Sequence, residues 1–230
     1  MAAAFVSNGA DPVVVGHAGA AKPLRILAIG SSSTQGIGAS APAHAYPAQL
    51  AVDLTSQWGI AADVRNAGIG GEVASTTLVR LKAALAGDKP DLVIWQVGTN
   101  DAVVNVDMAE FRATVEAGVA AARARHVPMI LIDPQFYAGI KDLARFQQYV
   151  TTIGDIAAHD HVPVFSRFAG MKAWAEHSAS ALRALMSSDG FHMGDQGYAC
   201  FAQELANDIA HDSAHVTKSA DADKPVATKM

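Results

Sequence analysis

Three consecutive serines, Ser31 to Ser33, follow directly after an apolar run in the stretch LRILAIGSSSTQGIG, residues 24–38. A serine hydroxyl is a poor nucleophile until a base accepts its proton and hydrogen-bond donors stabilise the oxyanion that forms on the substrate. A nucleophilic serine here therefore requires a histidine and two or three donors elsewhere in the chain. The alternative is a polar turn after a strand, because Gly and Ser are common turn residues.

His192 is the histidine best placed to act as that base. It lies in SSDGFHMGDQGY, residues 187–198, where Asp189 precedes it by three residues in a glycine-containing loop. This spacing lets a carboxylate reach the second imidazole nitrogen, fix its tautomer and stabilise the imidazolium. The other eight of the nine histidines fit surface or helix-capping roles. An Asp-x-x-His pair also fits a loop ion pair, so the spacing alone leaves both interpretations open.

Polar, glycine-containing turns follow three predicted strands. They are Ser31–Thr34, Asn66–Gly71 and Gly98–Asp101. In open parallel sheets, ligands bind beyond the carboxyl ends of the strands. Each turn alone suits an ordinary loop, but their placement at one edge of the sheet favours a site there.

Four segments, GSSSTQG, NAGIGGE, GTND and DGFHMGDQGY, occur in this order and resemble the signature segments of the SGNH subgroup of the GDSL hydrolases. The resemblance covers residues 24 to about 210. It implies that Ser32 is the nucleophile and that His192 and Asp189 complete a triad. It also implies an oxyanion hole made by the backbone amides of Ser32 and Gly71 and the side-chain amide of Asn100. Ser31 or Ser33 as nucleophile stays a minor alternative.

The chain departs from this family pattern at position 31, where serine replaces the usual aspartate. The replacement removes a negative charge beside the nucleophile and leaves nucleophile, base and donors in place. We therefore expect altered bracing of the turn and an altered substrate preference, and we keep a catalytically inactive relative as an alternative. Asp101 and Asn66 are expected to brace their turns rather than to react.

The resemblance implies a serine ester hydrolase that works through an acyl-serine without a metal or organic cofactor, in a family of esterases, thioesterases and carbohydrate deacetylases, so the natural substrate stays open. Because the sequence shows no long lid, interfacial amphipathic helix or carbohydrate-binding appendage, a short acyl ester, including an acetyl group on a sugar, fits better than a long-chain lipid. Phe136, Tyr137 and Phe191 are expected either to frame the substrate pocket or to serve as ordinary packing. The rival from another class is a phosphate- or nucleotide-binding module, because a Gly/Ser loop joins a strand to a helix. That loop lacks the lysine of a P-loop and the spacing of a dinucleotide fold.

Short β-rich apolar runs alternate with segments of helical period along the chain. This alternation predicts one flavodoxin-like, three-layer α/β/α domain with a five-stranded parallel sheet. The expected strands are 24–30, 62–68, 91–98, 127–133 and 162–166. The expected helices include one on which Tyr46, Leu50 and Leu54 share a face, one opened by Asp107 and Glu110 as a capping box, and those near 73–86, 141–159, 169–184 and 195–211.

Length and composition fit one soluble globular domain. The chain has 230 residues, of which 17% are charged, a net charge of -5 and a single cysteine, Cys200, which excludes an internal disulfide framework. We expect a flexible segment over 1–22, the hydrolase domain over 23–211 and a disordered tail over 212–230. The scattered basic residues argue against nucleic-acid binding, and the apolar runs are too short for a membrane span. The loose N-terminal segment favours a periplasmic or extracellular location over a cytoplasmic one.

Overall fold

The computed structural model describes residues 22–87 and 89–222 and contains one five-stranded sheet in that part of the chain. All of its strand pairs are parallel, and the strand order is β2-β1-β3-β4-β5. The predicted three-layer α/β/α fold with a five-stranded parallel sheet is confirmed. The strands are β1 (Leu24–Gly30), β2 (Ala62–Gly68), β3 (Leu92–Gln96), β4 (Met129–Ile132) and β5 (Val164–Phe165).

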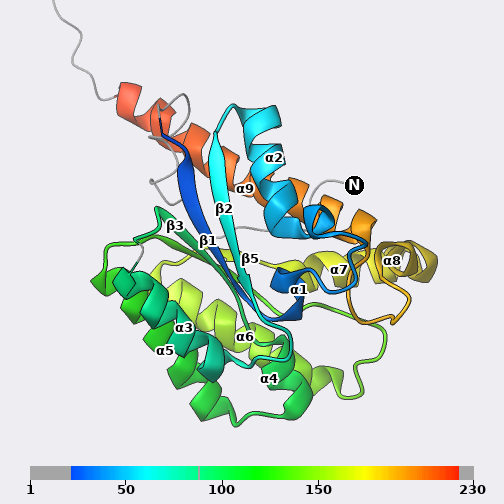
Figure 1. The fold of residues 1–230 in the computed structure, drawn as a ribbon. Helices are drawn as coiled ribbons and strands as arrows, with labels where there is room; N and C mark the ends of the chain where they lie inside the picture. The colour runs from blue at the N-terminus through cyan, green and yellow to red at the C-terminus, as the bar shows by residue number, and fades with distance from the viewer. Residues whose placement is uncertain (1–21, 88, 223–230) are drawn as a thin grey trace, which may run out of the picture.

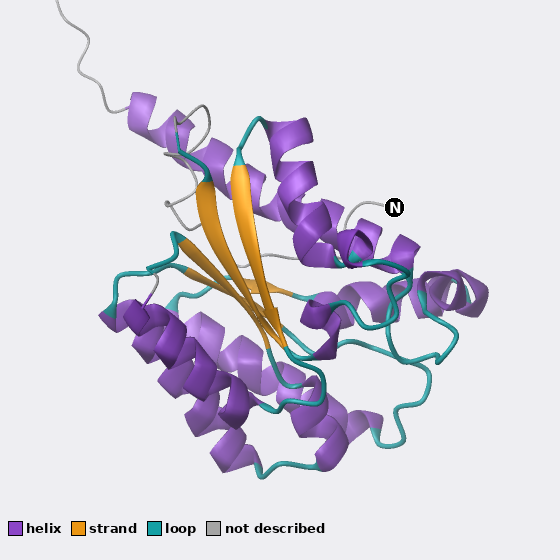
Figure 2. Cartoon of the chain, in the orientation of Figure 1, coloured by secondary structure: helices purple, strands orange, loops and turns teal. Residues whose placement is uncertain are grey.

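Helices cover both faces of this sheet, as Figures 1 and 2 show. On one face lie α2 (Tyr46–Trp58) and α9 (Asp195–Ala222), which pack against each other. On the other face lie α3 (Ala74–Gly87), α5 (Met108–Ala124) and α6 (Leu143–Asp160). Asp107 caps α5 as predicted, because its side chain accepts hydrogen bonds from the amides of Ala109 and Glu110.

The central strands supply both hydrophobic cores because successive side chains point to opposite faces. Leu24, Ile26 and Ala28 of β1 belong to the core beneath α2 and α9. Leu27 and Ile29 belong to the core beneath α3, α5 and α6. Burial on both faces explains why β1 reads as a nearly continuous apolar run.

The carboxyl ends of the strands meet at one edge of the sheet, where short helices replace two of the predicted turns. Helix α1 (Ser32–Gln35) follows β1, and α4 (Thr99–Val104) follows β3 after Gly98. A short 3-10 helix, η2 (Pro42–His44), precedes α2. Gly30 pairs with Gly68 across β1 and β2, which places the first two turns side by side.

Two elements differ from the sequence-based expectation. The helix expected over 169–184 is divided into α7 (Arg167–His177) and α8 (Ala179–Leu185), because Ser178 has an extended backbone and its hydroxyl caps α8. Helix α9 ends at Ala222, beyond the expected domain end at residue 211. The added segment has few large apolar residues, but its alanines favour a helix.

The two ends of the chain lie mostly outside the described residues. Residues 1–21 of the expected flexible segment and residues 223–230 of the expected tail lie outside the described residues. Within the described residues, no helix combines the length and the apolar character needed to cross a membrane.

Candidate active site

The three serines of the opening motif contact three different partners. The backbone amide and the hydroxyl of Ser31 both donate to Oε1 of Gln96, at 2.9 Å and 3.1 Å. The hydroxyl of Ser33 donates to Oε1 of Gln135 at 3.0 Å. The hydroxyl of Ser32 lies 2.9 Å from Nε2 of His192. Among these three hydroxyls, Ser32 is the one that faces an imidazole.

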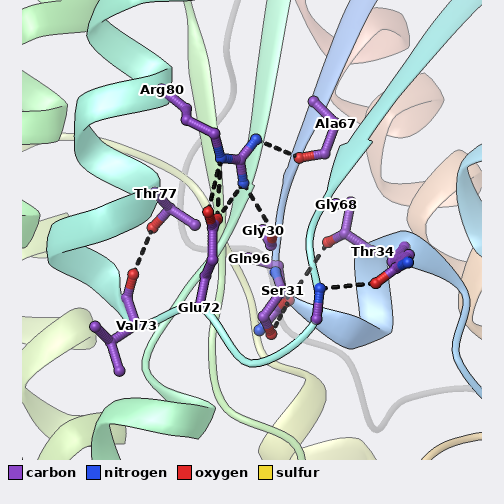
Figure 3. Close-up of polar contacts among 12 residues, drawn as sticks. Gly30, Ser31, Thr34, Ala67, Gly68, Glu72, Val73, Thr77, Arg80 and Gln96 are labelled. Atoms are coloured by element: carbon purple, nitrogen blue, oxygen red, sulfur yellow. Dashed lines mark hydrogen bonds and ion pairs between the residues drawn. The ribbon is translucent and has the colours of Figure 1, made fainter.

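Ser32 is held at the start of helix α1, where backbone amides have no partner within the helix. Ser32 is 8% exposed, so its side chain is largely covered by the surrounding residues. Thr34, two residues later, also approaches Oε1 of Gln96 at 3.4 Å. A neutral amide oxygen on β3 therefore braces the turn at the position where the family pattern has an aspartate (Figure 3).

His192 is oriented by Asp189, which lies on the same loop. Nδ1 of His192 is 2.6 Å from Oδ2 of Asp189, while Oδ1 of Asp189 accepts the amides of Phe191 and His192. Partial desolvation opposes the ionised carboxylate, but hydrogen bonds from His192, from the hydroxyl of Ser187 and from these amides outweigh it. They hold the pKa of Asp189 well below its usual range. The predicted Asp-x-x-His pair thus forms a continuous chain to the Ser32 hydroxyl.

Gly71, on the loop after β2, and Asn100, in the first turn of α4, are the other predicted oxyanion donors. Gly71 has a φ of +81°, a conformation that favours glycine, and it is exposed. Nδ2 of Asn100 donates to the backbone carbonyl of Glu72 at 2.8 Å, so Asn100 is tied to the residue that follows Gly71. Because an asparagine amide carries two hydrogens, this bond leaves the second one for a ligand.

The loop that carries Gly71 is also bound to helix α1. Oε1 of Gln35 accepts the amide of Gly70 at 2.7 Å. The side chain of Asn66 accepts the amide of Gly68 at 2.9 Å, as expected of a turn-forming residue. A Cβ on Gly68 would lie 2.0 Å from the amide nitrogen of Gln35, so glycine is required where α1 crosses the end of β2.

Asp101 braces its turn in the way the sequence predicts. Its carboxylate accepts the backbone amide of Ala74, the first residue of α3, at 3.0 Å and 3.1 Å. Burial raises the pKa of Asp101, and the amide hydrogen bonds partly offset this effect. The carboxylate thereby joins the start of α4 to the start of α3.

Gln96 and Gln135 contribute to the site although the sequence reasoning did not single them out. Gln135 is fully buried, and its Nε2 donates to the carbonyl of Phe191 at 2.6 Å while its Oε1 accepts Ser33. Gln135 follows β4 at the same edge of the sheet. Because ligands bind beyond the carboxyl ends of parallel strands, its position after a predicted strand could have indicated a place in the site. Gln96 gave no signal of its own because it lies within an apolar strand.

Two of the three predicted pocket aromatics form a line of rings that ends at His192. The rings of Tyr137 and Phe191 meet edge to face at 4.8 Å, and the rings of Phe191 and His192 do so at 4.8 Å. Phe136 instead packs against Phe168 and the hydrophobic cores. Within the described residues, no group of three His, Cys, Asp or Glu side chains is arranged to hold a metal ion.

Comparisons with known proteins identify the family and the fold. The model of the Non-GDSL lipase-like family matches residues 4–215. No curated protein sequence matches the chain.

Several solved structures share the fold at low sequence identity. The crystal structure of TesA superimposes with a TM-score of 0.69 at 22% identity and covers 82% of this chain and 99% of its own. A two-domain esterase, CEX, active on acetylated mannans, gives a TM-score of 0.75 at 24% identity over 92% of this chain and 56% of its own. The SGNH-hydrolase family esterase AlinE4 gives 0.62 at 25% identity over 84% of this chain and 97% of its own. The chain therefore belongs to the Non-GDSL lipase-like family and is an ester hydrolase with the SGNH/GDSL fold.

Proposed function

We propose that this ester hydrolase cleaves short acyl esters through an acyl-serine intermediate on Ser32, with His192 as the general base and Asp189 as its orienting carboxylate. The observation that carries the proposal is the unbroken chain from Asp189 through both imidazole nitrogens to the Ser32 hydroxyl, with links of 2.6 Å and 2.9 Å. Both distances lie within the reach required of a nucleophile and its base.

In the acylation half, the Ser32 oxygen attacks the ester carbonyl carbon while Nε2 of His192 takes the hydroxyl proton. Collapse of the tetrahedral intermediate breaks the bond to the alcohol oxygen, and the imidazolium returns the proton to that leaving alcohol. In the second half, His192 removes a proton from water, whose oxygen attacks the acyl carbon. Collapse breaks the bond to the Ser32 oxygen, the imidazolium returns the proton to that oxygen, and the carboxylic acid leaves. Asp189, held ionised, stabilises the imidazolium in both halves.

The oxyanion of each tetrahedral intermediate is assigned to three donors: the amide of Ser32, the amide of Gly71 and the side-chain amide of Asn100. The amide of Ser32 opens helix α1, and Asn100 is already oriented by the Glu72 carbonyl. Removing one such donor typically lowers the rate by roughly 10²- to 10³-fold. The three donors come from the segments that follow β1, β2 and β3, with Ser32 in α1 and Asn100 in α4.

An acetyl or similarly short acyl group on a carbohydrate is the proposed substrate. The two-domain esterase CEX, which shares the fold over 92% of this chain, is active on acetylated mannans. The line of rings through Tyr137 and Phe191 ends beside His192, where it offers an aromatic wall to a sugar ring.

The test compares the wild type with Ser32→Ala and His192→Ala on p-nitrophenyl acetate and its longer acyl homologues. Circular dichroism establishes that each variant is folded. We expect both variants to lose activity, because the first lacks the nucleophile and the second lacks its base. We expect the wild-type kcat/KM to fall as the acyl chain lengthens.

Ser31→Ala and Ser33→Ala serve as matched controls, since each removes a neighbouring hydroxyl that contacts a glutamine rather than His192. Both are expected to keep most of the activity. Full activity of folded Ser32→Ala would contradict the proposed nucleophile. A kcat/KM that rises with chain length would contradict the proposed short acyl group.

A further inference from the structure

We propose that Arg80, on helix α3, is a positioning residue that sets the oxyanion hole through its ion pair with Glu72. The inference rests on the proposed function, since it concerns donors assigned there. Arg80 does not belong to any of the signature segments. It acts through the ends of β1 and β2 and the side chain of Glu72, and not on the substrate.

The Arg80 guanidinium joins two backbone carbonyls and one carboxylate that lie beside the site. Nη1 donates to the carbonyl of Ala67 at 2.8 Å, and Nη2 donates to the carbonyl of Gly30 at 3.3 Å. Nε contacts the carboxylate of Glu72 at 3.0 Å and 3.1 Å, and Nη2 binds the same carboxylate. Figure 3 shows Arg80 between these partners. One side chain thus spans the ends of β1 and β2 and the loop after β2.

Two of these contacts lie close in sequence to an assigned oxyanion donor. Gly30 is two residues before Ser32, and Glu72 directly follows Gly71. The carbonyl of Glu72 accepts Nδ2 of Asn100 at 2.8 Å. Fixing Glu72 therefore fixes the Gly71 amide on one side and the orientation of the Asn100 amide on the other.

The partial burial of the pair makes it rigid. The side chain of Glu72 is 12% exposed and that of Arg80 is 26% exposed. A guanidinium fork can hold a carboxylate and two carbonyls at fixed angles, whereas the lysine ammonium is a flexible point charge. Because a displacement of about 1 Å can lower a rate by roughly 100-fold, this rigidity matters most for the transition state.

The experiment measures kcat and KM for Arg80→Gln, Arg80→Lys and Glu72→Gln on p-nitrophenyl acetate, together with thermal unfolding and the rate at which a phosphonate ester labels Ser32. Labelling also passes through an oxyanion, so it reports the hole independently of ester turnover. Arg112→Gln is the matched control, since Arg112 forms an ion pair with Asp155 at 3.3 Å on the surface of α5 and α6.

We expect kcat and the labelling rate to fall roughly 10- to 100-fold in Arg80→Gln, within the effect of a misplaced group. KM should change by less than about threefold, because ground-state binding makes little use of the oxyanion donors. Arg80→Lys should lie between Arg80→Gln and the wild type. Arg112→Gln should match the wild type in all measurements.

Wild-type kcat and labelling rate in folded Arg80→Gln would overturn the inference. If Arg80→Gln does not fold, Glu72→Gln decides, since a fall in its kcat supports the inference and a wild-type kcat overturns it. Failure of the proposed function looks different. In that case Ser32→Ala stays active, whereas failure of the present inference leaves Ser32→Ala inactive and the Arg80 variants active.

Discussion

Three adjacent hydroxyls of the same chemistry differ in what they face, and this difference separates their roles. Ser31 is bound to Gln96 and Ser33 to Gln135, while Ser32 faces His192. The family resemblance singled out Ser32, whereas the residues by themselves left the choice among the three open. The partners could not be predicted from the sequence, because Gln96 and Gln135 stand 65 and 102 positions away from the serines that they bind.

The pH dependence of the reaction follows from Asp189 at this same scale. Partial desolvation raises the pKa of Asp189, but hydrogen bonds from His192 and Ser187 outweigh this effect and lower the pKa. A lowered pKa keeps the carboxylate ionised as the pH falls toward about 4, the ordinary aspartate value. We therefore predict that protonation of Asp189 adds no step to the acid limb of kcat/KM above about pH 4. A pH–rate profile measures it, and a slope of two would contradict the prediction.

Asp189→Asn provides the comparison for that profile. Asparagine presents an N–H to the imidazole and favours the wrong tautomer, so we expect kcat/KM to fall by roughly 10²- to 10⁴-fold, the range of general-base contributions.

The ionisation of Asp189 also makes the folding stability depend on pH. Because the folded-state pKa of Asp189 is lowered, its contribution is present above the unfolded pKa and is lost as the pH falls below it.

At the scale of elements, the loop after β4 is joined to two other parts of the site by one side chain. Gln135 accepts the Ser33 hydroxyl of helix α1 and donates to the Phe191 carbonyl on the loop of His192. The backbone amide of Gln135 donates to the hydroxyl of Thr99 at 3.3 Å, and Thr99 directly precedes Asn100. A buried residue without regular secondary structure thus links the segments that carry nucleophile, base and oxyanion donor.

We predict that Gln135→Ala lowers both stability and kcat. The substitution leaves the Ser33 hydroxyl and the Phe191 carbonyl without this partner, and each buried polar group left unpaired costs about 1–3 kcal/mol. Denaturant unfolding and ester kinetics measure the two effects. Gln148→Ala, at an exposed position of α6, is the control and should change stability by less than about 0.5 kcal/mol. Unchanged stability in Gln135→Ala would contradict the linking role.

At the scale of the whole molecule, the parallel sheet explains why three of the four signature segments meet at one edge, and the loop between α8 and α9 adds the fourth. The alternation of apolar runs and helical segments predicts five strands, with polar turns at the carboxyl ends of three of them. The structure confirms the five strands and their sequence along the chain. Local capping by Ser178 divided a helix that its sequence period suggested was continuous. Arg80 could not have been singled out, because a helical arginine signals a role only when its partners are known.

The measurement to make first is the mass of the protein and of its peptides after reaction with a fluorophosphonate. The proposal predicts one adduct, on the Ser32 oxygen, that is lost in Ser32→Ala and forms much more slowly in His192→Ala. The Ser31→Ala and Ser33→Ala controls should label like the wild type. An adduct on Ser31 or Ser33, or a folded wild type that is not labelled, would contradict an acyl-serine mechanism at Ser32.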